Sequence, residues 1–202
     1  MVRYVGPVEQ VRGRWPEAVV SPDVASTGRV QAWVVGPGLG LDALEALRAV
    51  LATDEPVLVD ADALTLCAQE PVLLERTAPT LLTPHDREFA RFGNPVGDDR
   101  IGAARRLAAE LGVHVLLKGS ATVVAAPDGR VRINPTGSPY LASAGSGDVL
   151  AGAVGALLAQ GLDPLDAASV GAYLHGLAGD RARRGAAALV EVWPEVVRGL
   201  EG

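Results

Sequence analysis

Residues 134–152 read NPTGSPYLASAGSGDVLAG, and they join a loop of small residues to the start of a helix. Glycine stands on both sides of Ser146, and Asp148 follows at once. Small residues let the backbone approach an anion closely, and free amides at a helix N-terminus attract negative charge. Asp148 is also a residue favoured for capping a helix. Because a cap alone needs no glycine pair, the stretch predicts a phosphate pocket with Asp148 placed as a general base.

Around this stretch, short apolar runs alternate with helical patterns. We expect strands over 1–6, 30–35, 56–60, 80–83 and 113–117, and helices over 41–51, 61–69, 98–111, 148–160, 164–183 and 192–200. An Asp-Gly turn at 128–129 separates two further strands, 121–126 and 130–133, and predicts a late β-hairpin. The alternation predicts an α/β fold whose mostly parallel central sheet has helices on both faces. We find no linker or repeat, so residues 1–202 are expected to form a single domain.

The composition argues against several classes of protein. The chain has 202 residues, 49% of them hydrophobic, a net charge of −6 and no extended basic run, which disfavours a nucleic-acid partner. Its apolar stretches fall short of the roughly 18–20 residues that cross a membrane. Cys67 is the single cysteine and forms no disulfide framework, while His114 and His175 lie in apolar surroundings where we expect structural packing. The default is a cytoplasmic protein without a membrane or nucleic-acid partner.

One basic residue stands out by its type. Of the 18 lysines and arginines, only Lys118 is a lysine. It opens the turn KGSAT (118–122), directly after an apolar strand. A coding bias that replaces lysine by arginine wherever the exchange is harmless explains such a composition, and a flexible ammonium is not equivalent to a planar guanidinium. A retained functional lysine and chance survival in a tight turn both fit this count.

Three further strand ends carry candidate ligand-binding groups. The glycine loop at 36–40 is similar to the dinucleotide fingerprint, but its third glycine comes one residue early, so it predicts only a glycine-lined approach to a ligand. His85 follows Thr-Pro at a strand end, where it either binds a ligand or caps the next helix. Asp60 and Asp62 follow another strand, where Mg²⁺ binding and helix capping are equally good readings.

Taken in order, five runs resemble the NAD(P)H-hydrate dehydratases of the ribokinase-like superfamily. The runs are VVGPGLG, PVLVDADAL, LLTPHDREFARF, VLLKGSATVV and NPTGSPYLASAGSGDVLAG, which extend from Val34 to Gly152. The resemblance implies a three-layer ribokinase-like fold. It also implies a repair enzyme that uses ADP or ATP, with Mg²⁺, to dehydrate the S-epimer of NADH hydrate or NADPH hydrate. In that reaction a phosphoryl group moves to the ring hydroxyl of the hydrate and then leaves as phosphate.

The resemblance further implies roles for individual residues. Asp148 would be catalytic and would face the ring hydroxyl of the hydrate. The residues implied to bind the nucleotide are Lys118, Gly119, Ser120, Ala121, Thr122, Gly145, Ser146 and Gly147. Those implied to bind the hydrate are Gly38, Gly40, His85 and Asp148.

The chain departs from the family pattern in three places. Asp86-Arg87 stand where the family often has Pro-Gly, and Ser138-Pro139-Tyr140 stand where it often has Asn-Pro-Gly. Family members also carry a preceding strand, glycine-rich loop and helix. The resemblance makes the first strand here a second strand of the central sheet, so we expect an N-terminally incomplete domain. An open strand edge favours association, so we expect a homo-oligomer or a poorly stable chain.

Two other functions remain open from the sequence. One is a kinase of the same superfamily that phosphorylates a vitamin-precursor alcohol, because the same anion pocket and carboxylate would serve it. The other is a non-catalytic fragment that binds nucleotide without turnover.

Overall fold

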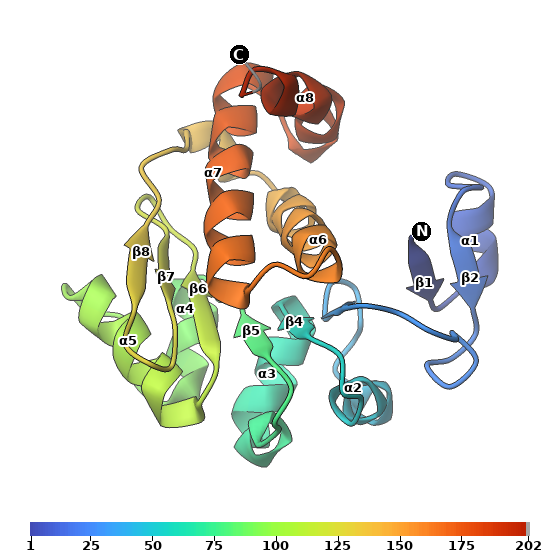
Figure 1. Ribbon diagram of the computed structural model, residues 1–202, viewed down its shortest axis with the longest axis horizontal. Coiled ribbons are helices and arrows are strands. Elements are labelled where there is room, and N and C mark those ends of the chain that lie inside the picture. The colour runs from blue at the N-terminus through green and yellow to red at the C-terminus, as the bar shows by residue number, and fades with distance from the viewer. Residues whose placement is uncertain (201–202) are drawn as a thin grey trace.

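Six strands form the central sheet of the computed structural model, which describes residues 1–200 and only the backbone of residues 8 and 10 (Figure 1). In spatial order they are β3 (Trp33–Val35), β4 (Val57–Val59), β5 (Thr80–Leu82), β6 (His114–Leu117), β7 (Val123–Ala125) and β8 (Val131–Ile133). Strands β3 to β6 pair in parallel, whereas β6, β7 and β8 pair antiparallel. The predicted parallel sheet and late hairpin are confirmed.

Helices cover both faces of this sheet. One face packs against α2 (Leu44–Leu51), α3 (Ala61–Gln69) and α5 (Arg100–Leu111). The other packs against α6 (Ser146–Ala159) and α7 (Pro164–Ala182), and α8 (Ala186–Arg198) lies against α7. Successive residues of one strand belong to opposite faces: Val57 and Val59 join the first layer, and Leu58 joins the second. Strands buried on both faces read as continuous apolar runs, which is why the sequence revealed them.

Short elements connect these layers. The helix α4 (Asp86–Phe89) follows β5, and the 3₁₀ turns are η1 (Pro71–Leu74), η2 (Ala90–Phe92) and η3 (Pro139–Leu141). Gly112 ends α5 in a left-handed conformation.

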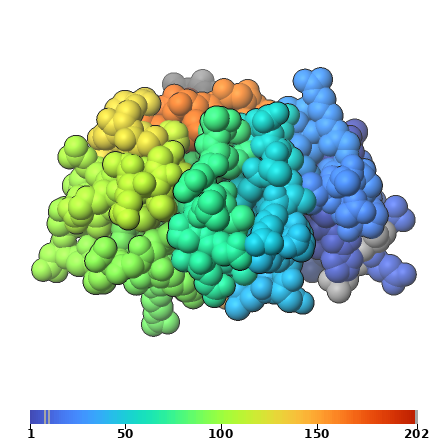
Figure 2. All heavy atoms as spheres, turned by 90° about the horizontal axis from the view of Figure 1, so that it is seen from below, coloured from blue at the N-terminus to red at the C-terminus, as the bar shows by residue number. Residues whose placement is uncertain are grey.

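The N-terminal segment contributes no strand to the central sheet. Its elements are β1 (Arg3–Val5), α1 (Val8–Arg12) and β2 (Val19–Ser21), and β1 pairs with β2 in a parallel sheet of its own. The expectation that the first strand belongs to the central sheet was therefore wrong, and α1 and β2 were missed. Elements of three to five residues carry too few positions to show a period. Viewed from below, the colours follow the chain order from this blue segment to the green of α5 (Figure 2).

The interior holds Cys67 and, as expected from its apolar surroundings, His175. Cys67 is fully buried, and burial raises the pKa of its thiol to about 12. His175 of α7 is 6% exposed, its ring lies 6.4 Å from that of Trp193 of α8, and its Nδ1 has no hydrogen-bond partner within residues 1–200. Burial lowers the pKa of His175 to about 4. None of the helices in this part of the chain combines the length and apolar character needed to span a bilayer.

The buried imidazole predicts an acid-sensitive stability. The folded pKa of His175 lies below its value in an unfolded chain, so the uncharged form favours folding. This contribution is complete above the unfolded pKa of about 6.5 and is lost as the pH falls toward the folded pKa. It should remove about 3 kcal/mol from the free energy of unfolding between pH 7 and pH 4. Urea unfolding of wild type and His175→Leu across this range should show that difference, and identical pH dependence in both proteins would contradict it.

Candidate active site

Four loops meet at one edge of the central sheet, because the carboxyl ends of parallel strands lie together. Residues 36–40 follow β3, Asp60 follows β4, His85 comes soon after β5, and Lys118 follows β6. The start of α6 lies at the same edge, since a side-chain carbon placed on Gly147 would stand 3.6 Å from Lys118 Nζ. The structure therefore brings together loops that are far apart in the sequence.

An ion pair crosses this edge. Lys118 Nζ lies 2.7 Å from Asp60 Oδ1 and 3.8 Å from Glu88 Oε2. Because β4 and β6 flank β5, the lysine side chain reaches over the end of β5 to meet the first carboxylate. Asp60 is 2% exposed and the Lys118 side chain 19%, so the pair is largely shielded from water. The backbone of Lys118 is fixed as well, because Arg100 Nη2 donates to its carbonyl at 2.9 Å while Arg100 Nη1 pairs with Asp86 at 2.7 Å.

The first turn of α6 has backbone amides without a side-chain cap. Gly145 precedes the helix with φ +81, a left-handed conformation that favours glycine. Serine is a common capping residue, but the Ser146 hydroxyl donates a hydrogen bond to the carbonyl of Leu141 instead. No side chain caps the helix at the N-cap position, so this end keeps the anion-attracting character that the glycine pair predicted.

Asp148 lies in this first turn beside the ion pair. Its side chain is exposed. Partial burial of the carboxyl group raises the pKa of Asp148, the negative charge of Asp60 raises it further, and the Lys118 ammonium opposes both. A carboxyl group that is accessible and has an elevated pKa is suited to proton transfer.

The glycine loop after β3 approaches the backbone of the neighbouring strand. A side chain at Gly36, which has φ +125, would overlap the carbonyl of Asp60. Gly40 N–H donates to Asp62 Oδ2 at 2.9 Å, which ties the loop to α3. Asp62 thus accepts a hydrogen bond from the glycine loop, and Asp60 pairs with Lys118. Neither carboxylate caps α3 with its side chain. Within residues 1–200, no cluster of three His, Cys, Asp or Glu residues is arranged to hold a metal ion.

His85 caps the helix that follows it. Its Nδ1 accepts from the backbone N–H groups of Arg87 and Glu88 at 3.1 and 3.2 Å, and Glu88 Oε2 accepts from the His85 N–H at 2.8 Å. This reciprocal capping box settles the cap question left open by the sequence. The imidazole is half-exposed, and its Nε2 lies 3.6 Å from Glu88 Oε2. Because Nδ1 is used as an acceptor, the neutral ring carries its proton on Nε2.

Most remaining predicted residues lie in exposed loops along this edge. Gly119, Ser120 and Ala121 are exposed in the turn between β6 and β7, as is Gly38 in the glycine loop. Sequence reasoning missed Glu88 and Arg100. The His-x-x-Glu spacing of the capping box was a local signal for Glu88, whereas nothing in the sequence joined Arg100 to a carbonyl 18 residues away.

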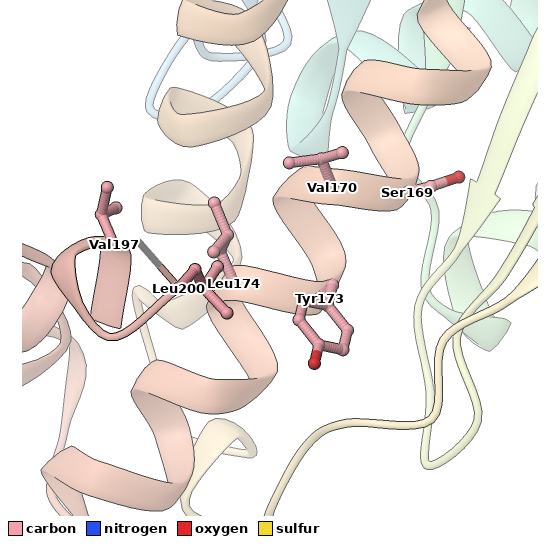
Figure 3. A pocket seen from close by; sticks show the side chains of 6 residues that line it. All are labelled: Ser169, Val170, Tyr173, Leu174, Val197 and Leu200. Atoms are coloured by element: carbon pink, nitrogen blue, oxygen red, sulfur yellow. The ribbon is translucent and has the colours of Figure 1, made fainter. Parts of the chain in front are cut away.

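An apolar groove lies elsewhere, between α7 and the C-terminal end of α8 (Figure 3). Its volume is about 480 Å³. It is lined by Ser169, Val170, Tyr173, Leu174, Val197 and Leu200. None of these is a predicted site residue, and five of the six carry no group suited to acid–base chemistry. The candidate active site is therefore the strand edge rather than this groove.

Comparison with known proteins identifies the family of this chain. The sequence profile of the family described as NAD(P)H-hydrate dehydratase matches residues 2–194. The bifunctional NAD(P)H-hydrate repair enzyme Nnr of Mycobacterium leprae is 55% identical over 88% of this chain, which spans 39% of that protein. The ADP-dependent (S)-NAD(P)H-hydrate dehydratase of Neisseria meningitidis is 42% identical over 82% of this chain and 60% of its own length.

Among solved structures, the ADP/ATP-dependent NAD(P)H-hydrate dehydratase from Bacillus subtilis, co-crystallised with ATP/Mg²⁺, is 30% identical with a TM-score of 0.77. The match covers 94% of this chain and 74% of that one. Sequence and fold agree along almost the whole chain, and the chain belongs to the NAD(P)H-hydrate dehydratase family.

Proposed function

We propose that this chain dehydrates the S-epimer of NADH hydrate or NADPH hydrate to the reduced cofactor, with hydrolysis of ADP or ATP. The observation that carries the proposal is the convergence of Lys118, Gly147 and Asp148 at one edge of the sheet. A cation, an uncapped helix start and an accessible carboxylate are the groups that phosphoryl transfer to a hydroxyl requires. The names of the relatives support the same reaction.

In this mechanism the start of α6 and Lys118 bind the phosphoryl group that is transferred. The N–H groups at the start of α6 donate hydrogen bonds to the terminal phosphate of the nucleotide, and Lys118 stabilises its charge during transfer. Asp148 takes the proton from the ring hydroxyl of the hydrate as its oxygen attacks phosphorus. The C–O bond of the phosphorylated hydrate then breaks, phosphate leaves, and the ring loses a proton to give NADH or NADPH. With ADP the balance is hydrate and ADP giving NADH, AMP and phosphate.

Other residues of the edge are assigned by their position. We place the nucleotide against the turn that follows β6, with Gly119, Ser120, Ala121 and Thr122 beside it. Gly145 and Ser146 shape the start of α6. The hydrate then lies toward Gly38, Gly40 and His85, whose Nε2–H is available as a hydrogen-bond donor.

Mg²⁺ is proposed to enter with the nucleotide as part of the co-substrate. The residues near the site do not fit a resident metal, because Asp60 is paired with Lys118 and Asp62 accepts from Gly40. Mg²⁺ commonly binds through phosphates with one or two carboxylates.

We further propose that residues 1–202 act as one domain in the cytoplasm, without a nucleic-acid partner. The net charge of −6 is unfavourable for phosphate backbones. A homo-oligomer is proposed because β3 is an edge strand and Val34 within it is 39% exposed. Sedimentation of the purified chain would test this assembly.

The dehydratase proposal is separated from the kinase alternative by the product that accumulates. The chain should be incubated with ADP or ATP and NADH hydrate, and separately with thiazole and pyrimidine alcohols, followed by mass spectrometry. We expect NADH and phosphate from the hydrate and no stable phosphorylated compound. Accumulation of a phosphorylated alcohol would favour the kinase. Nucleotide binding without phosphate release would indicate a non-catalytic chain.

A further inference from the structure

We propose that Asp60 is a positioning residue, which holds the Lys118 ammonium at the start of α6 so that one of its N–H groups faces the transferring phosphoryl group. This inference rests on the proposed function. It assigns a role to Asp60, for which the sequence favoured neither helix capping nor Mg²⁺ binding.

The first observation is that the Asp60 side chain does not cap the helix that follows it. It occupies the N-cap position of α3, and aspartate is among the residues most favoured there because its carboxylate accepts helix amides. Its side chain accepts no amide of α3. Oδ1 instead accepts from Lys118 Nζ at 2.7 Å, 58 residues further along the chain. The carboxylate is directed across the sheet edge rather than along its own helix.

The second observation is that the backbone on both sides of the Asp60 side chain is tightly constrained. Ala61 has φ 48, a left-handed conformation that is unfavourable for a residue with a side chain. On the other side, Gly36 packs so closely on the Asp60 carbonyl that only a glycine fits. Strained backbone of this kind persists where surrounding structure over-determines it, and it is concentrated at functional sites.

The third observation is the arrangement of acceptors around the ammonium. Lysine has a flexible stem and three N–H donors. One donor is engaged by Asp60 at 2.7 Å, and Glu88 Oε2 at 3.8 Å attracts the ammonium without a hydrogen bond. A side-chain carbon placed on Gly147 would stand 3.6 Å from the same Nζ. The ammonium is thus held within reach of the helix start, and donors that Asp60 does not use are left for the anion proposed to bind there.

The charged groups that face Asp148 are Asp60 from β4 and Lys118 from β6, and Glu88 of α4 faces the lysine in turn. Asp60→Asn removes a negative charge and leaves the ammonium. The pKa of Asp148 should then fall, because Asp60 raises it and Lys118 lowers it. The acid limb of the pH–rate profile should move to lower pH, which reports the Asp60 charge beside Asp148, whereas the positioning of Lys118 is tested by the two measurements below.

The kinetic test is a double-mutant cycle between Asp60→Asn and Lys118→Met. In the wild-type background, Asp60→Asn should lower kcat on the order of 10²-fold, as a small misplacement of a catalytic group does. In the Lys118→Met background the same substitution should have no further effect on kcat, because Asp60 acts through the lysine. Asp128→Asn is the matched control, since it removes an exposed ion-paired carboxylate from the hairpin turn at the opposite end of β7. An equal loss in both backgrounds would overturn the inference.

A second measurement does not depend on turnover. Because Lys118 is the only lysine, ¹⁵N-lysine labelling gives a single side-chain ammonium signal. We expect this signal to be resolved in wild type and to shift on addition of ADP, and to be broadened by solvent exchange in Asp60→Asn. An unchanged signal in Asp60→Asn would refute positioning even if the enzyme is active. A changed signal in a chain that does not dehydrate NADH hydrate would refute the proposed function and leave the positioning role intact.

Discussion

Asp148→Asn is expected to lower kcat by about 10²- to 10⁴-fold, the range typical for loss of a general base. The amide has nearly the same shape as the carboxylate but does not accept the proton of the attacking hydroxyl. Nucleotide binding should persist, because the anion pocket is made by backbone amides at the start of α6 rather than by this side chain. Steady-state kinetics with NADH hydrate, together with calorimetric titration of ADP, would measure the two effects separately.

Asp128→Asn again serves as the control, because it makes the same chemical change in an exposed turn away from the site. Full activity in Asp148→Asn would remove this residue from the mechanism. Loss of nucleotide affinity equal to the loss of kcat would mean that the carboxylate binds rather than catalyses.

Lys118→Ala is expected to reduce the free energy of unfolding by about 3–5 kcal/mol, as removing one partner of a buried ion pair does. The cause is Asp60, which is 2% exposed and would keep a charge without its counterion. The variant should also bind ADP and ATP more weakly, because the cation beside Gly147 is lost. Urea unfolding and calorimetric titration would measure these two losses.

The chain provides a matched control for this prediction. Arg48 and Glu70 also pair at 2.7 Å, but their side chains are 44% and 37% exposed. Arg48→Ala should therefore cost far less stability than Lys118→Ala. Replacing both buried partners, in Asp60→Leu with Lys118→Met, should restore much of the stability without restoring nucleotide affinity. Unchanged affinity for ADP and ATP in Lys118→Ala would exclude contact between this lysine and the nucleotide.

The sequence predicted the central sheet because its strands are buried on both faces. Val57, Leu58 and Val59 form an uninterrupted apolar run, which needs no knowledge of contacts to recognise. The β1–β2 unit lacked such a signal, because its strands have three residues each and retain exposed positions. The helix bounds differed by a few residues where the first turn is set by a cap, as at Asp99 for α5.

The location of the candidate site could be proposed from the sequence, whereas its internal contacts could not. Lys118 and His85 each stood near a strand end, and parallel strands bring such ends together. The pairing of Asp60 with Lys118 depends on side-chain directions across β5, and a local alternative, capping of α3, was equally reasonable for that aspartate. The choice at His85 was likewise open, until the structure showed its Nδ1 bonded to two amides of α4.

The reaction itself is tested most directly by counting NADH formed against phosphate released when the purified chain acts on (S)-NADH hydrate with ADP. Transfer to the ring hydroxyl followed by loss of phosphate predicts one NADH for each phosphate, and neither product in the absence of the hydrate. Phosphate release without NADH, or a phosphorylated hydrate that persists, would contradict the proposed dehydration.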